Sequence, residues 1–292
     1  MSTIASAWPG GPAAIAAPRM LEGAGFEVRR PLPCGALQSV GPFIMLDHIG
    51  PEDVGPGEAL GAPRHPHAGL ETLTIYLESG GEHRDSLGNH SVTGPGEIQW
   101  MRAGRGLVHD EGPHPGLLRD GGRSHAVQLW LDLPGEYRSL EPAYRHVRAA
   151  EIPVCEEVGV RLRVLAGDAA GLRGPVDTVT APLLLHVFLE PGARWTHALA
   201  VAQLGTYVLA GGLAGLRADG ELPDGTLLLN PPERLVAGAQ GAELLVLGGP
   251  ALPAPPFRHG PFVADDRAGM IATVERYQRG DFGDVATPGE PA

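Results

Sequence analysis

Short apolar runs separated by turn-forming residues fill most of the first half of the chain, between residues 28 and 133. Residues 70–77 form one such run, and residues 124–133 form another, with apolar side chains at alternate positions. The chain contains 43 glycines and 29 prolines, which are scattered and follow no collagen-like period. Turn formers at this density favour many short strands over long helices. The regular strand–turn spacing predicts an all-β fold, either a sandwich or a barrel.

A second strand-rich block follows residues 134–158. We interpret those residues as a connector, because they carry several charges and because their prolines would interrupt a strand ladder. The block itself contains five apolar runs, at residues 160–165, 183–190, 207–209, 226–229 and 243–247. A length of 292 residues suits two domains, since domains average roughly 150 residues. We expect an N-terminal domain over residues 1–135 and a C-terminal domain over residues 136–292.

One helix is predicted near the C-terminus, at residues 266–279. Asp265 or Asp266 can cap its first turn, and Gly280 lies where a helix-terminating glycine belongs. An apolar stripe at helical spacing is formed by Met270, Val274 and Tyr277. The stripe predicts that this helix packs on one of the β domains.

The net charge of −12 argues against nucleic acid or an anionic membrane as a direct partner, since both reward clustered basic residues. The two cysteines, Cys34 and Cys155, fit a reducing compartment. Residues 1–6 show neither the basic nor the apolar region of a secretory signal. Residues 198–216 carry no charge and are long enough to span a bilayer. Their four glycines and their polar residues indicate strands broken by turns instead. We therefore expect a cytoplasmic protein without a membrane segment.

Two short motifs carry the chemistry of a metal site. His65 and His67 form a His-x-His pair, and His109 and Glu111 form a His-x-Glu pair further along the chain. If both pairs lie on strands, each pair has its two side chains on one face, because strand side chains alternate. Three imidazoles and one carboxylate are a near-complete ligand set for one divalent transition metal. Spacing alone leaves ordinary surface or turn histidines equally open as an interpretation.

The two pairs belong to an ordered series of longer motifs. Between residues 41 and 134 the series reads GPFIMLDH (41–48), HPHAGLET (65–72), DSLGN (85–89), GPGEIQWM (94–101), AGRG (103–106), HDE (109–111) and QLWLDLP (128–134). HGPFV (259–263) and YQRGDFG (277–283) follow near the C-terminus. This ordered set resembles the pirin family, whose members are bicupins. The resemblance is dense from residue 40 to residue 134, thin from residue 156 to residue 250, and returns at the C-terminus.

The resemblance implies two cupin barrels (double-stranded β-helices, or jelly rolls) packed together, with a short C-terminal helix and a metal only in the N-terminal barrel. By matching positions, the implied metal ligands are His65, His67, His109 and Glu111. The implied cofactor is one divalent ion, Fe(II) before all others, with Mn, Ni, Cu and Zn left open. The sequence departs from the family pattern at Asp110, where a small residue is usual, and at Ala68, where Arg is common. We expect Asp110 to point away from the metal and Ala68 to alter the mouth of the pocket.

Glu71 is the alternative carboxylate ligand, because many cupins place a glutamate three or four residues after the His-x-His pair. The resemblance favours Glu111, with Glu71 orienting a ligand imidazole. Trp100 and Trp130 are expected to pack the barrel, with an aromatic wall for a flat substrate as the alternative. The remaining histidines are given non-ligand roles: His48 and His125 in the core or at the rim, His83, His90 and His114 in solvent, and His186 and His197 in the block without a second ligand pair.

The resemblance also implies a function. Bacterial pirins can act as quercetin 2,3-dioxygenases, and animal pirins act as transcriptional co-regulators. We therefore expect a metal-dependent dioxygenase, an oxidoreductase that opens flavonols such as quercetin with O₂. Its substrate would be a small aromatic molecule that chelates the metal, and Glu111 would be its catalytic general base. The alternative is a non-catalytic, metal- and redox-sensing regulatory protein that binds protein partners. A non-redox metal cupin, such as an isomerase or lyase, is a third hypothesis.

Overall fold

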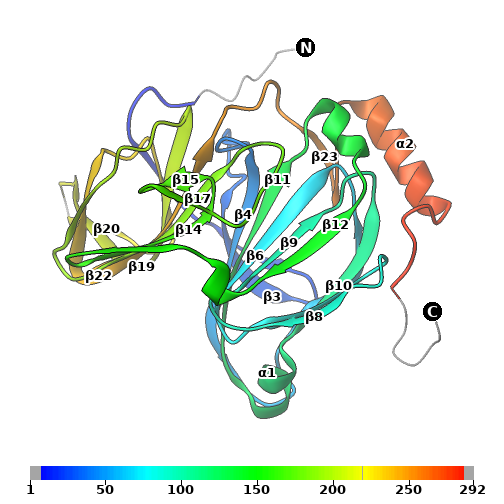
Figure 1. Cartoon of the computed structure of the whole chain (residues 1–292), viewed down its shortest axis with the longest axis horizontal. Helices are drawn as coiled ribbons and strands as arrows, with labels where there is room; N and C mark the ends of the chain where they lie inside the picture. Colours follow the sequence, from blue (N-terminus) through cyan, green and yellow to red (C-terminus); the bar gives the residue numbers. More distant parts are fainter. Residues whose placement is uncertain (1–7, 219, 286–292) are drawn as a thin grey trace. The chain divides into compact units, whose positions relative to one another are not determined.

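The computed structural model describes residues 8–218 and 220–285, and most of these residues lie in antiparallel strands (Figure 1). The chain forms two compact units made of interleaved segments. We call the first the site unit, and it contains Arg19–Val28, Asp47–Ala149 and Pro256–Ala292. The second unit contains Met1–Pro18, Arg29–Leu46 and Ala150–Pro255. Because the two units are interleaved along the chain, they do not test a single boundary in the sequence. The predicted boundary between residues 135 and 136 stays a prediction.

Two antiparallel sheets build the site unit. The smaller sheet has the strand order β5-β10-β7-β8, with bounds β5 Ala62–His67, β7 Gly81–Asp85, β8 His90–Thr93 and β10 Leu107–Pro113. The larger sheet has the order β12-β9-β6-β11-β4-β3-β2, and β3 and β4 also contribute residues to the second unit. Its bounds are β2 Arg19–Glu22, β3 Phe26–Leu32, β4 Phe43–Val54, β6 Leu70–Glu78, β9 Ile98–Arg102, β11 Gly122–Asp132 and β12 Ala143–Val147.

The two faces of the larger sheet differ in chemistry. Leu73 and Ile75 of β6 are fully buried on one face, where they pair with Leu129 and Val127 of β11. The opposite face carries Thr74, and Gln128 of β11 donates to its hydroxyl at 3.3 Å. This polar face packs against the inner face of the smaller sheet, as hydrogen bonds between side chains of the two sheets show. Strand alternation therefore places an apolar layer behind the larger sheet and polar side chains between the two sheets.

The second unit is a β-structure with an apolar core. Its main sheet has the order β1-β21-β19-β22-β17-β14-β13, with β18 and β20 paired alongside. The bounds are β1 Ala13–Ala16, β13 Val154–Glu157, β14 Val160–Ala166, β17 Leu183–Leu189, β18 Arg194–Thr196, β19 Gln203–Arg217, β20 Gly220–Pro223, β21 Thr226–Leu229 and β22 Arg234–Gly249. A two-stranded sheet adds β15 Asp168–Ala169 and β16 Leu172–Arg173. Leucines and valines at alternate positions form the core of this unit, which confirms the strands predicted for this block.

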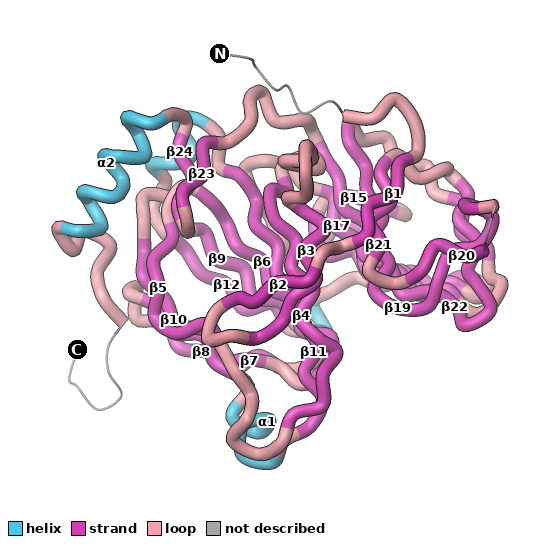
Figure 2. The backbone as a smooth tube through the Cα atoms, turned by 180° about the vertical axis from the view of Figure 1, so that it is seen from behind, coloured by secondary structure: helices cyan, strands magenta, loops and turns pink. Residues whose placement is uncertain are grey.

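The C-terminal helix is confirmed. Helix α2 spans Arg267–Gln278, and the Asp266 carboxylate caps it by accepting from Gly269 N at 2.8 Å. Met270 is buried and packs with Phe262 and Phe282, while β23 Phe257–His259 and β24 Phe262–Ala264 form a small hairpin beside the helix. Figure 2 shows this hairpin and α2 at the same edge of the site unit as β5. The short helix α1, Pro115–Asp120, and the 3-10 turns η1, Gly135–Ser139, and η2, Ala149–Glu151, were not predicted from the sequence.

The interpretation of residues 134–158 as a connector is wrong. They contain β12, which pairs with β9, and β13, which pairs with β14. Pro142 and Pro153 immediately precede these strands, and a proline before a strand removes no hydrogen bond from its ladder. The uncharged stretch at residues 198–216 contributes most of strand β19. Among residues 8–218 and 220–285, no helix is long and apolar enough to cross a membrane.

Candidate metal centre

Strand register brings the histidine pairs together. β10 pairs antiparallel with β5, which sets His109 opposite His65 and Leu107 opposite His67. On its other side β10 pairs with β7, which sets Glu111 opposite His83. A register shift between His109 and Glu111 places Glu111 opposite Ala62. All these imidazoles and the carboxylate therefore belong to the inner face of the smaller sheet.

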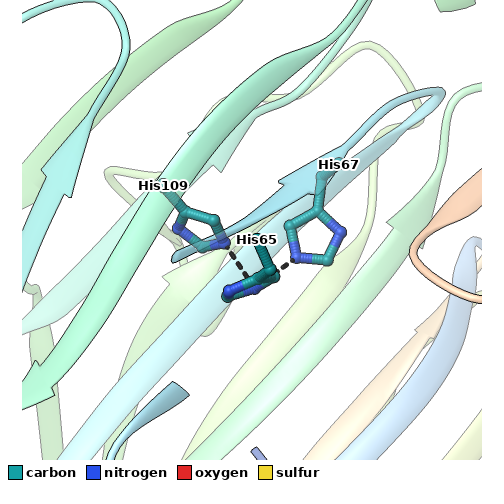
Figure 3. Close-up of side chains that lie close together, drawn as sticks. All are labelled: His65, His67 and His109. Carbon is teal, nitrogen blue, oxygen red and sulfur yellow. Dashed lines mark hydrogen bonds between the residues drawn. The ribbon is translucent and has the colours of Figure 1, made fainter. Parts of the chain in front are cut away.

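The three imidazoles of the two motifs converge on one point (Figure 3). His65 Nε2 lies 3.1 Å from His67 Nε2 and 2.8 Å from His109 Nε2. His65 Nδ1 lies 2.8 Å from Pro63 O, and His67 Nδ1 lies 3.1 Å from Pro261 O. A carbonyl oxygen only accepts, so both Nδ1 atoms carry the proton and both Nε2 atoms present a lone pair. Lone pairs that face one another are stabilised by a cation between them, so this arrangement suits a metal ion.

Burial keeps two of these imidazoles, those of His67 and His109, neutral. It lowers the pKa of His67 to about 3, helped by repulsion from His65 and opposed by the hydrogen bond to Pro261. Burial, together with repulsion from His67 and His65, also lowers the pKa of His109 well below the usual value. Metal ligands must be deprotonated to bind. At neutral pH the imidazoles of His67 and His109 are therefore already neutral. A metal ion can bind them without displacing a proton.

Glu111 lies beside the three imidazoles. Its Oε2 is 4.0 Å from His109 Nε2 and accepts from Gln128 Nε2 at 3.0 Å. The Gln128 amide oxygen accepts from Trp130 Nε1 at 3.4 Å, and the Trp130 ring meets the His67 ring edge-on at a centroid distance of 4.9 Å. Trp130 thus lies at the metal cluster, whereas Trp100 is on the apolar face of the larger sheet, paired with Leu73.

The donor set fits a divalent transition metal. Ligand nitrogens about 2.1 Å from one ion lie about 3.0 Å apart when they are adjacent in an octahedron and about 3.4 Å apart in a tetrahedron. The spacings of 3.1 and 2.8 Å from His65 Nε2 to His67 Nε2 and His109 Nε2 are compatible with one face of an octahedron. Such a face leaves positions open for Glu111 and for exogenous ligands.

The C-terminal segment supports this cluster from outside. Val263 N donates to Ala68 O at 3.0 Å, and Pro261 O receives the His67 proton. Gly69, with φ +77°, approaches β24 so closely that a Cβ there would lie 2.0 Å from Val263 O. Ala68 is buried against Phe262 in this contact, and its expected effect on the mouth of the pocket stays a prediction. A residue 194 positions away in the sequence thus fixes the tautomer of His67.

The prediction that His83 lies in solvent is wrong. Its side chain is 2% exposed, and its Nε2 lies 3.0 Å from Asp85 Oδ2. The His83 ring stacks on Tyr144 at 4.2 Å and contacts the His109 ring at 5.4 Å. Burial would raise the pKa of Asp85, but hydrogen bonds from His83 and Asn89 bring that pKa below its usual value. One feature of the sequence could have indicated this pair. His83 and Asp85 are two residues apart in the short run GEHRD (81–85), so on a strand both side chains lie on one face.

Glu71 is not in the cluster. It lies on the apolar face of β6 with Leu73 and Ile75, and its Oε1 accepts from Arg102 Nε at 3.3 Å. Since Thr74 marks the opposite, metal-facing side of the same strand, the predicted role of Glu71 in orienting an imidazole is wrong. Asp110 alternates with His109 and Glu111 along β10, as expected for a side chain that points away.

The other histidines have structural partners or lie apart from the cluster. His48 Nε2 and His125 Nε2 are buried and 2.7 Å apart, which confirms a pair in the core. His90 is exposed and bonds Glu82, and His114 Nδ1 caps α1 by accepting from Gly116 N. His186 Nε2 lies 2.8 Å from Glu243 Oε1 in the second unit. Within the part of the chain that the structure describes, every potential metal-ligand group belongs to the site unit.

The fold and this cluster define a cupin with a histidine-rich candidate metal centre. Two family models match the chain: "Pirin" over residues 25–131 and "Pirin C-terminal cupin domain" over residues 184–283. The chain belongs to the pirin family, and its fold is that of a bicupin with a short C-terminal helix.

Individual relatives agree with this assignment. The chain is 36% identical to a pirin-like protein of Caulobacter vibrioides over 230 residues, which cover 77% of this chain and 78% of the relative. It is 31% identical to human pirin, with 83% of each chain covered. The crystal structure of quercetin 2,3-dioxygenase from Acinetobacter baumannii superposes with a TM-score of 0.85 at 29% identity, covering 94% of this chain and 98% of that one.

Proposed function

We propose that this chain is a metal-dependent dioxygenase that opens flavonols such as quercetin with O₂. The observation that carries the proposal is the meeting of three imidazole Nε2 atoms, two of them fixed as lone-pair donors, beside a partly exposed carboxylate. Similarity to the quercetin 2,3-dioxygenase of Acinetobacter baumannii supports the choice of reaction and substrate.

We propose His65, His67, His109 and Glu111 as the ligands of one ion, with Fe(II) as the resident metal. Three imidazoles and one carboxylate suit iron. When bound, the ion would supply a Lewis acid and a redox centre with open positions. Metal analysis of the purified protein distinguishes iron from Mn, Ni, Cu and Zn.

The side chains around the ligands have separate tasks in this proposal. Glu111 accepts the proton of the flavonol 3-hydroxyl, and Gln128 holds Glu111 Oε2 at 3.0 Å so that the carboxylate stays at the cluster. Trp130, edge-on to His67 at 4.9 Å, gives a flat substrate an aromatic surface. Ring opening of the flavonol consumes one O₂ and releases one CO, which balances the atoms of the ring-opened ester.

The test is turnover by iron-loaded protein. The metal-free chain is loaded with Fe(II) without oxygen, mixed with quercetin and air, and followed by O₂ uptake, quercetin absorbance and CO release. We expect equal consumption of O₂ and quercetin with one CO per turnover. His65→Ala should abolish all three signals, and His90→Ala, at an exposed histidine outside the cluster, should not.

The same assay separates the alternative function. A wild-type protein that binds iron yet depletes no more quercetin than His65→Ala would refute the dioxygenase proposal. The non-catalytic regulatory role would then be the remaining hypothesis. Its own prediction is a set of bound proteins that changes between the reduced and the oxidised metal.

A further inference from the structure

A second group of ligand atoms overlaps the first. One ligand atom each from His83, His109 and Glu111 lies within 4.8 Å of the other two. Neighbouring ligand atoms on one ion lie about 3.0–3.4 Å apart, so side-chain movements on the order of 1 Å would close this group around an ion. Cross-strand pairing produces the arrangement, because His83 and Glu111 are directly opposite each other on β7 and β10.

His83 is held as metal-ligating histidines are held. Its Nε2 donates to Asp85 Oδ2 at 3.0 Å, which leaves Nδ1 with the lone pair. Asp85 is itself fixed, because its Oδ1 accepts from Leu87 N and Asn89 N, both at 3.0 Å. A ligand imidazole normally donates its other N–H to a carboxylate or a carbonyl. Tyr144, stacked on His83 with an interplanar angle of 11°, fixes the plane of the ring.

His109 is the ring that both groups share. Its Nε2 faces His65 at 2.8 Å and Glu111 Oε2 at 4.0 Å. Its Nδ1 is buried and has no hydrogen-bond partner among the described residues, whereas the Nδ1 atoms of His65 and His67 are anchored to carbonyls. No hydrogen bond at Nδ1 therefore fixes the orientation of the His109 ring, unlike the rings of His65 and His67.

The geometry points to a second position for a divalent transition-metal ion, bound by His83, His109 and Glu111. We call it the inner position, and we call the position between His65, His67 and His109 the outer one. Two imidazoles and one carboxylate are an established ligand set for zinc and for non-haem iron. Because His109 and Glu111 serve both positions, one chain holds one ion at a time. The outer position, with its third imidazole, is preferred when all ligands are present.

The inference rests on the proposed metal centre but not on flavonol chemistry. Its test is Co(II) binding to the double variant His65→Ala/His67→Ala, followed by calorimetry and by the visible absorption of Co(II). We expect one Co(II) per chain, with a Kd raised ten- to a thousandfold over the wild type. Adding His83→Ala should abolish binding, and adding His90→Ala should leave it unchanged.

Two further variants guard against loss of folding at this buried site. His83→Phe keeps the ring on Tyr144 without a nitrogen, and His83→Gln keeps a donor for Asp85. Either one, folded by circular dichroism, should remove Co(II) binding from the double variant. Binding by the wild type but not by the double variant overturns the inner position and leaves the proposed function standing, as does binding that persists without His83. A wild-type protein that binds no metal overturns both.

Discussion

Gly69→Ala tests whether the C-terminal segment sets the metal affinity. A Cβ at Gly69 would lie 2.0 Å from Val263 O and 2.9 Å from Val263 C, and both neighbours are backbone atoms. The segment around Gly69 and the segment around Val263 must move apart by roughly 1.5 Å to restore van der Waals contact. That movement would break the bond from Val263 N to Ala68 O and the bond from His67 Nδ1 to Pro261 O.

The magnitude follows from a matched glycine. Gly57 has φ +79°, close to the +77° of Gly69, but no atom lies within 4 Å of its Cβ position. Both alanine variants pay a backbone cost of about 1–2 kcal/mol for a positive φ. Only Gly69→Ala also loses two hydrogen bonds, at about 1 kcal/mol each. We therefore expect free energies of unfolding reduced by about 3–4 kcal/mol for Gly69→Ala and about 1–2 kcal/mol for Gly57→Ala.

The metal affinity should separate the two variants further. Loss of the acceptor that orients a ligand imidazole lowers metal affinity about 10- to 100-fold. Urea unfolding of the metal-free proteins and competition calorimetry with Ni(II) measure the two quantities. Equal Kd values for Gly69→Ala and Gly57→Ala would refute the idea that Pro261 positions His67.

Three further predictions concern the cluster itself. In the metal-free protein, the fold lowers the pKa values of His67 and His109. Below pH 6.5 these two imidazoles are therefore protonated in the unfolded chain but stay neutral in the folded one. Stability is therefore greatest above pH 6.5 and falls toward pH 3, by up to tenfold in the folding equilibrium per pH unit for each imidazole; urea midpoints that are equal at pH 7 and pH 5 would contradict this. Gln128→Leu should lower kcat for quercetin at least tenfold through misplacement of Glu111, unlike Gln38→Leu; unchanged kcat refutes the role of Gln128. Removing the metal with a chelator should lower the free energy of unfolding by about 3 kcal/mol at free metal a hundred times the wild-type Kd, and His65→Ala, whose affinity is weaker, should show a smaller change in a thermal melt at the same free metal concentration.

Much of the site was predictable because its chemistry is local. The spacing of two residues in His65-x-His67 and His109-x-Glu111 is enough to place each pair on one strand face, once strands are assumed. The helix at the C-terminus was equally visible, since Asp266 and Gly280 mark its ends. These features need only the preferences of neighbouring residues.

The remaining features depend on register and on distant contacts. His83 looks like a loop residue because β7 is only five residues long and lies between turns, yet pairing with β10 buries it opposite Glu111. The face that Glu71 occupies depends on how Gly69 turns the chain between β5 and β6, and spacing alone did not reveal it. Pro261 reaches His67 only after the whole chain has folded, so no local pattern announces it.

A crystal structure of the metal-loaded protein, with anomalous scattering measured at the absorption edge of the metal, tests the central claim most directly. We expect one anomalous peak per chain within about 2.3 Å of the Nε2 atoms of His65, His67 and His109. A peak elsewhere, with these three nitrogens more than about 4 Å from the ion, would contradict the proposed metal centre.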